Sequence, residues 1–371
     1  MELTLRACGK INLYLNVKKG YREDGYHEIK SIMQSIGLWD ELHFVVSRKT
    51  NANKKHSKLE CCNLECFTDF GESGDDKSGT DKGITEGVIS GKTNGEKREM
   101  LKKSNAGSEG VDNDSKVINR GDSSREQNGI YITSKNVEIP LDEKNLVHKA
   151  ALLVMQTFGL LGSYEININI IKHIPVCAGL GGGSADAAAT IVALNELFGL
   201  NMKEEEMLCL ASEVGADVPF CISGGTALAE GKGEKISKLP NLPFYWIVLA
   251  YNGKKFLSKD VYEKFDLVGR EKEAIHHKLV ESIIQRKYEE FFSCLENSLE
   301  EVVVKEDDKI RLLEETALGA GAIFAQMTGS GPTVFAVCED LRQAKKVCES
   351  LKGLANGVFL SHTISRSLEF V

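Results

Sequence analysis

Apolar and polar side chains alternate in two segments of the chain, and this period of two predicts β-strands. In KINLYLNV the apolar positions fall within residues 11–17, and in YEININIIKHIP they fall within residues 166–170. A third segment, residues 29–36, carries its isoleucine and methionine side chains at helical spacing. From these residues alone, helix and strand both stay open for that segment.

A period of 3.6 residues predicts helices in the middle of the chain. EKNLVHKAALLVMQTFG and SADAAATIVALNELFGL show this period, and Gly199 suits the C-terminal cap of the second helix. Asn201 with Glu204 marks the expected start of a third helix, in MKEEEMLCLASEVG. The segment ADVPFCISGGTALAEGKGEKI that follows is interpreted as a hairpin turning at Gly224 and Gly225.

The C-terminal third again mixes strands and helices. FYWIVLAY (244–251) predicts a buried strand that begins a second domain, and helices are expected through about residue 318. A strand, the turn TGSGP, the strand TVFAV, the helix LRQAKKVCESLKG and the strand GVFLSHTI complete the predicted order. The pattern is that of a mixed α/β chain with several antiparallel strands.

Residues 47–129 differ from the rest in composition. They are rich in Lys, Glu, Asp, Ser, Gly and Asn, and they contain too few large apolar side chains to offset the entropy of ordering. We expect a disordered insertion between two neighbouring strands, ELHFVVS and IYITSKNVEIP. It contains Cys61, Cys62 and Cys66, for which a metal or a partner is an open alternative, although no second ligand pair follows at zinc-finger spacing.

Composition and charge limit the classes of function that the chain can have. The chain has 371 residues and a formal net charge of -8, which argues against broad nucleic-acid binding. No apolar run approaches the roughly 18 residues of a membrane span, and the N-terminus has no signal or transit character. We therefore expect a cytoplasmic protein without nucleic-acid or membrane partners, whose scattered cysteines are mostly core thiols.

A glycine-rich loop, AGLGGGSADAAAT (178–190), lies between a predicted strand and a predicted helix. A helix N-terminus offers free N–H groups, and glycine lets the backbone approach an anion, so this loop predicts a phosphate site. It lacks the glycine spacing of the dinucleotide fingerprint and the lysine of the P-loop. The alternative is a tight connection that needs glycine only for its turn.

Three separated motifs resemble those of the GHMP kinases, which use a glycine loop of another kind. They are GKINLYLNV, HIPVCAGLGGGSADAA and MTGSGPTVFA, and they occur in the family's order. The resemblance implies an α+β fold with an N-terminal βαβ nucleotide-binding domain (1–240) and a C-terminal ferredoxin-like α/β domain (241–371). It also implies a strand after His27.

The chain departs from the family pattern in three places. The family usually has Pro-Ala where this chain has Cys8 and Gly9, and further glycines where it has Cys177 and Ala178. A frequent His-Pro-Gly is Tyr-Asn-Gly (251–253) here. None of these changes removes a catalytic group of the family, but they affect the shape of the phosphate loop.

Within the family, REDGYHEIKSIMQSIGLWDEL and GADVPFCISGGTALAEGKGE most closely resemble members that act on a cytidine diphosphate sugar alcohol. The resemblance implies phosphorylation of the 2-hydroxyl of that small molecule by ATP, in the non-mevalonate route to isoprenoid precursors. Alternatives are a mevalonate- or homoserine-type kinase, or a non-catalytic nucleotide- or RNA-binding protein. Oligomeric state does not follow from the sequence.

Two residues are the catalytic candidates. Asp217, in GADVP, is a turn aspartate or a general base on composition alone, and the resemblance implies the base. Lys10, the one charged residue of its strand motif, either points to solvent or, as in the family, lies beside the aspartate and steadies charge on the transferred group.

The resemblance also implies the ligand-binding residues. For the substrate it implies Asn12, with Tyr26 and Tyr262 stacking on the cytosine and His27 hydrogen-bonding its polar edge. ATP would be held by Asn145, Leu146, Lys172, Pro175, Gly179, Leu180, Gly181, Gly182, Gly183 and Ser184. A solvated strand end is the alternative for Lys172. Residues 329–331 are expected against the phosphates or substrate, and Mg²⁺ is expected with ATP, without a named protein ligand.

Overall fold

The structure is a computed structural model that describes residues 1–49 and 128–371, and these belong to one compact unit. The predicted insertion and its three cysteines lie almost wholly outside the described residues. The start predicted for the insertion was slightly early, because Ser47 and Arg48 still pair with a neighbouring strand.

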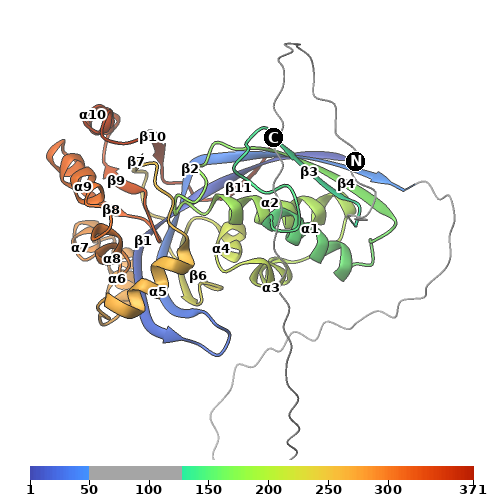
Figure 1. Cartoon of the computed structure of the whole chain (residues 1–371), viewed down its shortest axis with the longest axis horizontal. Helices are drawn as coiled ribbons and strands as arrows, with labels where there is room; N and C mark the ends of the chain where they lie inside the picture. Colours follow the sequence, from blue (N-terminus) through green and yellow to red (C-terminus); the bar gives the residue numbers. More distant parts are fainter. Residues whose placement is uncertain (50–127) are drawn as a thin grey trace, which may run out of the picture. The chain divides into compact units, whose positions relative to one another are not determined.

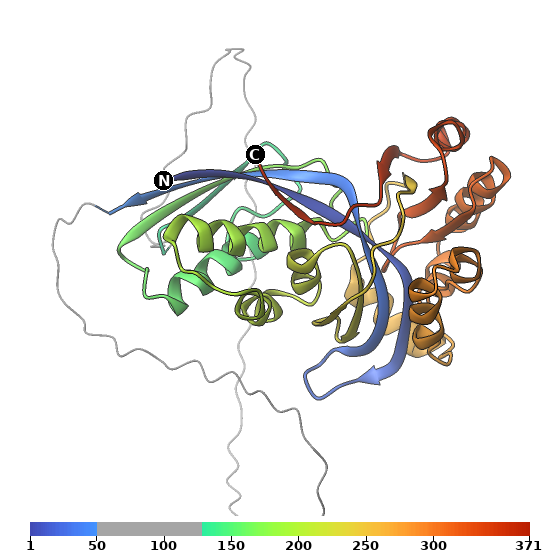
Figure 2. The ribbon, with the colours of Figure 1, turned by 180° about the vertical axis from the view of Figure 1, so that it is seen from behind.

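A mixed seven-stranded sheet carries the N-terminal half (Figures 1 and 2). Its path is β11-β1-β2-β4-β3, β5 pairs with another part of β2, and β6 pairs with β5. The strands are β1 (Glu2–Tyr21), β2 (His27–Arg48), β3 (Ile130–Ser134), β4 (Tyr164–Ile171), β5 (Thr226–Gly231), β6 (Lys235–Lys238) and β11 (Leu368–Phe370).

The segment with helical spacing, residues 29–36, is part of strand β2, as the resemblance implied. Between Ile29 and Gln34 this strand is paired on both edges, with β1 on one side and β5 on the other. Residues 31–36 are also all buried, and a strand buried on both faces has no need of strict alternation. Tertiary pairing therefore overrides the local period.

Helices cover one face of this sheet, as both ribbon views show (Figures 1 and 2). They are α1 (Leu146–Thr157), α2 (Gly182–Phe198), α3 (Glu204–Val214) and α4 (Val218–Ser223). Helix α2 is central, and its alanine run 187–189 is fully buried, because small side chains let it pack closely against α1 and β1. Gly199 ends α2 in the left-handed conformation, as predicted.

Two local predictions were wrong. Residues 218–223 form a short helix rather than a strand, since Pro219 stands in the first turn, where its fixed φ favours a helix start. The hairpin is β5–β6, which turns after Gly231. Helix α3 begins at Glu204 with Lys203 as its cap, whereas Asn201 has a positive φ of 54° and belongs to the preceding turn.

A third prediction, that β2 and β3 are neighbours, was also wrong. Strand β4 lies between them, antiparallel to β2 and parallel to β3. Residues around 166–168 of β4 pair with both strands. The two strands that flank the insertion are therefore separated by one strand.

A four-stranded sheet of order β10-β7-β9-β8 carries the C-terminal half, in the predicted order of elements. Its strands are β7 (Trp246–Tyr251), β8 (Phe324–Met327), β9 (Val334–Cys338) and β10 (Gly357–His362). The helices are α5 (Ser258–Val268), α6 (His276–Ile284), α7 (Tyr288–Ser293), α8 (Glu300–Val304), α9 (Lys309–Gly319) and α10 (Leu341–Leu351). The last strand, β11, returns to β1, so a division at residue 240 stays a prediction.

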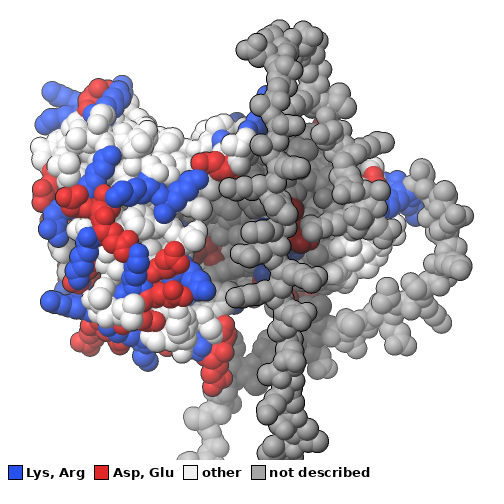
Figure 3. All heavy atoms as spheres, viewed as in Figure 1, with Lys and Arg blue, Asp and Glu red and all other residues white. Residues whose placement is uncertain are grey.

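Charges of both signs mix on the visible face of these C-terminal helices (Figure 3). Examples of surface pairs are Lys264 on α5 with Glu306, which follows α8, and Glu301 on α8 with its C-cap residue Lys305. Within the described ranges, no helix is long and apolar enough to cross a membrane.

Candidate active site

A cavity of about 790 Å³ opens where β1, the glycine loop, α4 and α5 meet. All the residues named from the sequence for catalysis, ATP or substrate line it, except Gly331 of the expected 329–331 segment. The lining residues include Lys10, Asn12, Tyr26, His27, Asn145, Leu146, Lys172, Pro175, Gly179, Leu180, Gly181, Gly182, Gly183, Ser184, Asp217 and Tyr262. The structure thus brings together positions that lie as far as 252 residues apart, from 10 to 262.

Lys10 and Asp217 form an ion pair in this cavity, with 3.2 Å between Lys10 Nζ and Asp217 Oδ2. The lysine side chain is 5% exposed and the aspartate 32%. Lys10 Nζ also donates a hydrogen bond of 2.7 Å to Asn12 Oδ1, and Asn12 is held in turn by Ser31. The carboxylate therefore faces the cavity, while the ammonium group behind it is fixed.

Strand β1 and the glycine loop are joined at this point. The backbone N–H of Lys10 donates to Leu180 O at 2.9 Å. A Cβ atom at Gly181 would lie 2.9 Å from Lys10 Cγ, and one at Gly179 would lie 2.5 Å from Thr328 O. Both glycines also have a positive φ, so no other residue fits either position without displacement.

The departure at Cys177 has a structural consequence. Its φ is 56°, in the left-handed region that glycine adopts without strain. The family's usual glycine at this position suits that backbone better. The chain nevertheless turns there, and its exposed thiol lies at the cavity wall.

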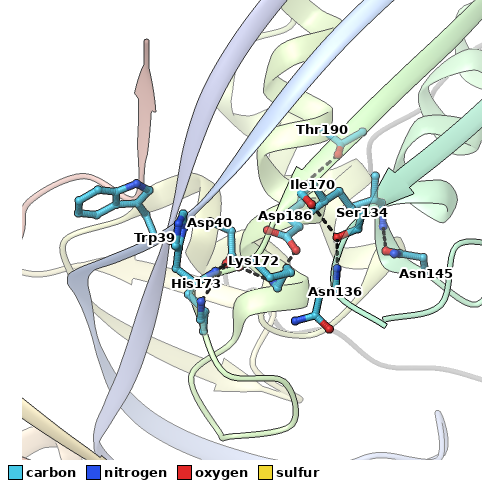
Figure 4. A network of polar contacts seen from close by, with 12 residues as sticks. Trp39, Asp40, Ser134, Asn136, Asn145, Ile170, Lys172, His173, Asp186 and Thr190 are labelled. Atoms are coloured by element: carbon cyan, nitrogen blue, oxygen red, sulfur yellow. Dashed lines mark hydrogen bonds and ion pairs between the residues drawn. The ribbon is translucent and has the colours of Figure 1, made fainter. Parts of the chain in front are cut away.

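Lys172 lies next to Gly182 of the glycine loop, between the carboxylates of Asp40 and Asp186 (Figure 4). Its Nζ is 2.7 Å from Asp186 Oδ2 and also binds Asp40, and all three side chains are at most 5% exposed. Burial alone would lower the pKa of Lys172, but Asp186 and Asp40 outweigh it and raise that pKa. The solvated strand end considered for Lys172 is excluded.

Asp40 and Asp186 were not found from the sequence. Asp40 is fully buried and accepts hydrogen bonds from the backbone N–H groups of His173 (2.6 Å) and Ile174 (2.9 Å). Burial raises the pKa of Asp186, whose Oδ1 has no hydrogen-bond partner among the described residues. A charged residue within an alanine run, as in GGGSADAAAT, was the available signal for Asp186.

At the adenine end predicted by the resemblance, Asn145 caps helix α1. Its Oδ1 accepts from Val147 N at 3.0 Å, and its Nδ2 donates to Pro140 O. Both polar atoms of the Asn145 side chain therefore form hydrogen bonds that hold the start of α1. Leu146, Pro140 and Lys144 line the cavity beside it.

Aromatic side chains gather at another part of the cavity wall. The His27 ring lies 5.0 Å from the Tyr262 ring and 4.6 Å from the Tyr21 ring, centroid to centroid. Tyr26 is 48% exposed, with Lys232 Nζ 4.7 Å from its ring centroid. Tyr21 and Lys232 line the cavity too, and the sequence did not single them out.

The TGSGP turn of the C-terminal half closes one wall. Thr328 Oγ1 accepts from Asn12 N at 2.8 Å, and Ser330 Oγ lies 2.9 Å from Ser258 Oγ. Gly329 and Ser330 line the cavity, but Gly331 does not. Such a site, with backbone N–H groups at a helix start and a carboxylate beside a buried ammonium group, can bind a phosphate and accept a proton.

Two family models match the chain. Residues 145–225 match the GHMP kinases N terminal domain, and residues 279–356 match the GHMP kinases C terminal domain. The first match contains the glycine loop and Asp217. The second contains the TGSGP turn.

Curated relatives extend the likeness over the full chain. A 4-diphosphocytidyl-2-C-methyl-D-erythritol kinase of Caldanaerobacter subterraneus is 32% identical over 371 residues, which are 100% of both chains. A protein of the same name from Listeria monocytogenes serotype 4a is 38% identical over 239 residues, which are 63% of this chain and 80% of the relative.

Solved structures share the fold. A crystal structure of 4-(cytidine 5'-diphospho)-2C-methyl-D-erythritol kinase has a TM-score of 0.63 at 22% identity and covers 98% of this chain and 99% of its own. Homoserine kinase from Cytophaga hutchinsonii has a TM-score of 0.64 at 17% identity, covering 100% and 97%. At these identities the likeness concerns the fold alone.

Proposed function

The chain belongs to the 4-diphosphocytidyl-2-C-methyl-D-erythritol kinases, a family of GHMP kinases, and from this premise we propose that it transfers the γ-phosphoryl group of ATP to the 2-hydroxyl of 4-diphosphocytidyl-2-C-methyl-D-erythritol. The observation that carries the proposal is the Lys10–Asp217 pair at 3.2 Å beside the glycine loop. The aromatic and histidine side chains in the same cavity support a nucleobase-bearing substrate.

Asp217 is the proposed general base. As the oxygen–phosphorus bond forms, its carboxylate accepts the proton of the substrate hydroxyl. Lys10 holds the carboxylate in place and stabilises charge on the transferred group, while Asn12 orients the lysine through its 2.7 Å hydrogen bond. Most of the rate gain in phosphoryl transfer comes from such positioning and charge stabilisation.

The glycine loop is the proposed phosphate site. Helix α2 begins at Gly182, so the N–H groups of its first turn point toward the loop and favour an anion. Asn145 and Leu146 would lie beside the adenine, whereas Lys172 is held by Asp186 and Asp40 next to Gly182 of the loop. Gly179 keeps the loop against the C-terminal half through its close approach to Thr328.

Magnesium is proposed as the ion that accompanies ATP and neutralises phosphate charge when bound. Mg²⁺ takes oxygen ligands, commonly one or two carboxylates together with phosphates. Asp186 Oδ1 suits this role, because it is a buried carboxylate oxygen with no hydrogen-bond partner among the described residues. Ser184, two residues earlier in α2, also lines the cavity.

A coupled assay of ADP release tests the proposal. Purified protein is given ATP, Mg²⁺ and, in separate reactions, the cytidine diphosphate sugar alcohol, mevalonate or homoserine. We expect turnover with the first substrate only. Turnover with mevalonate or homoserine alone, or with none of the three, would overturn the proposal. A cytoplasmic location and the domain division at residue 240 remain predictions that this assay does not address.

A further inference from the structure

His27 is tied to a carboxylate from a distant part of the chain. Its Nε2 lies 2.9 Å from Oδ2 of Asp266, which is 239 residues away on helix α5. The other oxygen of Asp266 accepts the backbone N–H of Gly20 at 3.0 Å. Although partial burial raises it, the bonds from Gly20 and His27 hold the pKa of Asp266 below its usual value. The carboxylate is therefore charged and fixed by two donors.

The histidine ring has little freedom to move. It packs against the rings of both Tyr21 and Tyr262, and its side chain is 4% exposed. His27 nevertheless lines the cavity. Its Nδ1 atom forms no hydrogen bond with any residue that the structure describes, so Nδ1 is the polar atom of the ring that remains for a ligand.

The carboxylate of Asp266 determines whether Nδ1 of His27 is a hydrogen-bond donor or acceptor. A neutral imidazole carries one N–H, and a carboxylate partner places that hydrogen on the nitrogen it contacts. Here that nitrogen is Nε2, because Asp266 can only accept. Nδ1 consequently carries a lone pair, so toward a ligand it can act only as a hydrogen-bond acceptor.

Cytosine and uracil differ at the group that meets such an acceptor. Cytosine carries an amino donor on C4, whereas uracil carries an oxygen acceptor there. We propose that Asp266 is a positioning residue that fixes the tautomer of His27 and thereby makes this end of the cavity select cytosine over uracil. The inference rests on the proposed function, since it assumes that the pyrimidine of the substrate lies beside His27.

The effect is measurable by binding alone. A site built to hydrogen-bond a ligand group rejects an analogue that cannot make the bond. Replacing an attraction with two facing acceptors changes the dissociation constant by roughly tenfold or more, because the hydrogen bond is lost and each unmet acceptor adds a further penalty. In calorimetry at pH 8, we expect CDP to bind roughly tenfold or more tightly than UDP.

Asp266→Asn tests the role of the carboxylate. An asparagine amide can donate to Nε2, which allows the tautomer with hydrogen on Nδ1 and so admits uracil. We expect the ratio of UDP to CDP dissociation constants to fall to within about threefold of unity, which is a difference under 1 kcal/mol. Asp260→Asn is the matched control, an exposed aspartate on the same helix that does not line the cavity, and it should keep the wild-type ratio.

The possible outcomes distinguish a failure of this inference from a failure of the proposed function. Wild type that prefers CDP while Asp266→Asn keeps the same ratio overturns the inference alone. Wild type that binds neither nucleotide overturns the proposed function, and the inference with it. If Asp266→Asn does not fold, ¹⁵N spectra of histidine-labelled wild type decide, with the His27 signals identified by their loss in His27→Gln. Hydrogen on Nε2 supports the inference, and hydrogen on Nδ1 contradicts it.

Discussion

Asp40→Asn probes the buried charges beneath the phosphate loop. In the wild type, one carboxylate oxygen of Asp40 accepts two backbone N–H groups, at 2.6 and 2.9 Å, and the other binds Lys172. Asparagine can keep the first two bonds with its oxygen. Its amino group must then face the ammonium group of Lys172, so one charge-assisted hydrogen bond is replaced by two facing donors.

The loss follows from this geometry. A hydrogen bond to a charged group contributes about 1.5–3 kcal/mol, and Lys172 keeps Asp186 as a partner, so the full cost of an unpaired buried charge does not apply. We expect the free energy of unfolding to fall by about 2 kcal/mol. Because Lys172 Nζ would lie 3.2 Å from a Cβ at Gly182, movement of the lysine also disturbs the loop, and we expect KM for ATP to rise roughly tenfold.

Urea unfolding and steady-state kinetics measure both effects. Glu41→Gln is the control, since Glu41 follows Asp40 in β2 and points to the opposite face. It should leave KM for ATP unchanged. If Asp40→Asn matches the wild type in stability and in KM for ATP, the buried charges do not support the loop and the reasoning is refuted.

Three further predictions follow from other parts of the structure. Tyr262→Ala should raise KM for the cytidine substrate roughly tenfold, since stacking contributes about 1–3 kcal/mol per base, and an equal rise in KM for ATP would contradict this role. Burial and the neighbouring Glu300 raise the pKa of Glu314 to about 8. Glu314 therefore keeps its proton in the folded protein, whereas the unfolded chain releases it near pH 4.5. The stability of the folded protein should thus decrease as the pH rises from about 4.5 to about 8. In thermal unfolding, Glu314→Gln should show a smaller decrease of the melting temperature over this pH range. Replacing residues 50–127 with about six Gly, Ser and Asn residues, enough to cross two strand spacings of about 5 Å each, should keep kcat; a soluble, folded but inactive variant would contradict this.

The elements with a clear period could be predicted from the sequence. Strands β1 and β4 and helices α1 and α2 follow their alternating or 3.6-residue patterns, and the glycine loop lies between β4 and α2 as expected. The segment 29–36 could not be settled by its own residues, since its strand conformation comes from pairing with β1 and β5.

Long-range contacts account for most of what the sequence did not reveal. Asp40 meets Lys172 across 132 residues, and His27 meets Asp266 across 239. Neither aspartate stands in a motif whose chemistry can be read locally. The position of β4 between β2 and β3 is likewise a property of the sheet, and it corrects the expectation that the two strands flanking the insertion are neighbours.

The turnover of Asp217→Asn tests the central claim most directly. Asparagine has nearly the same shape but cannot accept the hydroxyl proton, so kcat should fall by about 10² or more. Calorimetry should show CDP binding close to that of the wild type, because Asp217 acts on the reacting hydroxyl and not on the base. Lys10→Ala should lower kcat comparably, and the double variant should fall little further, since the two residues act as a unit. A folded Asp217→Asn enzyme with near-normal kcat would contradict the assignment of Asp217 as the general base.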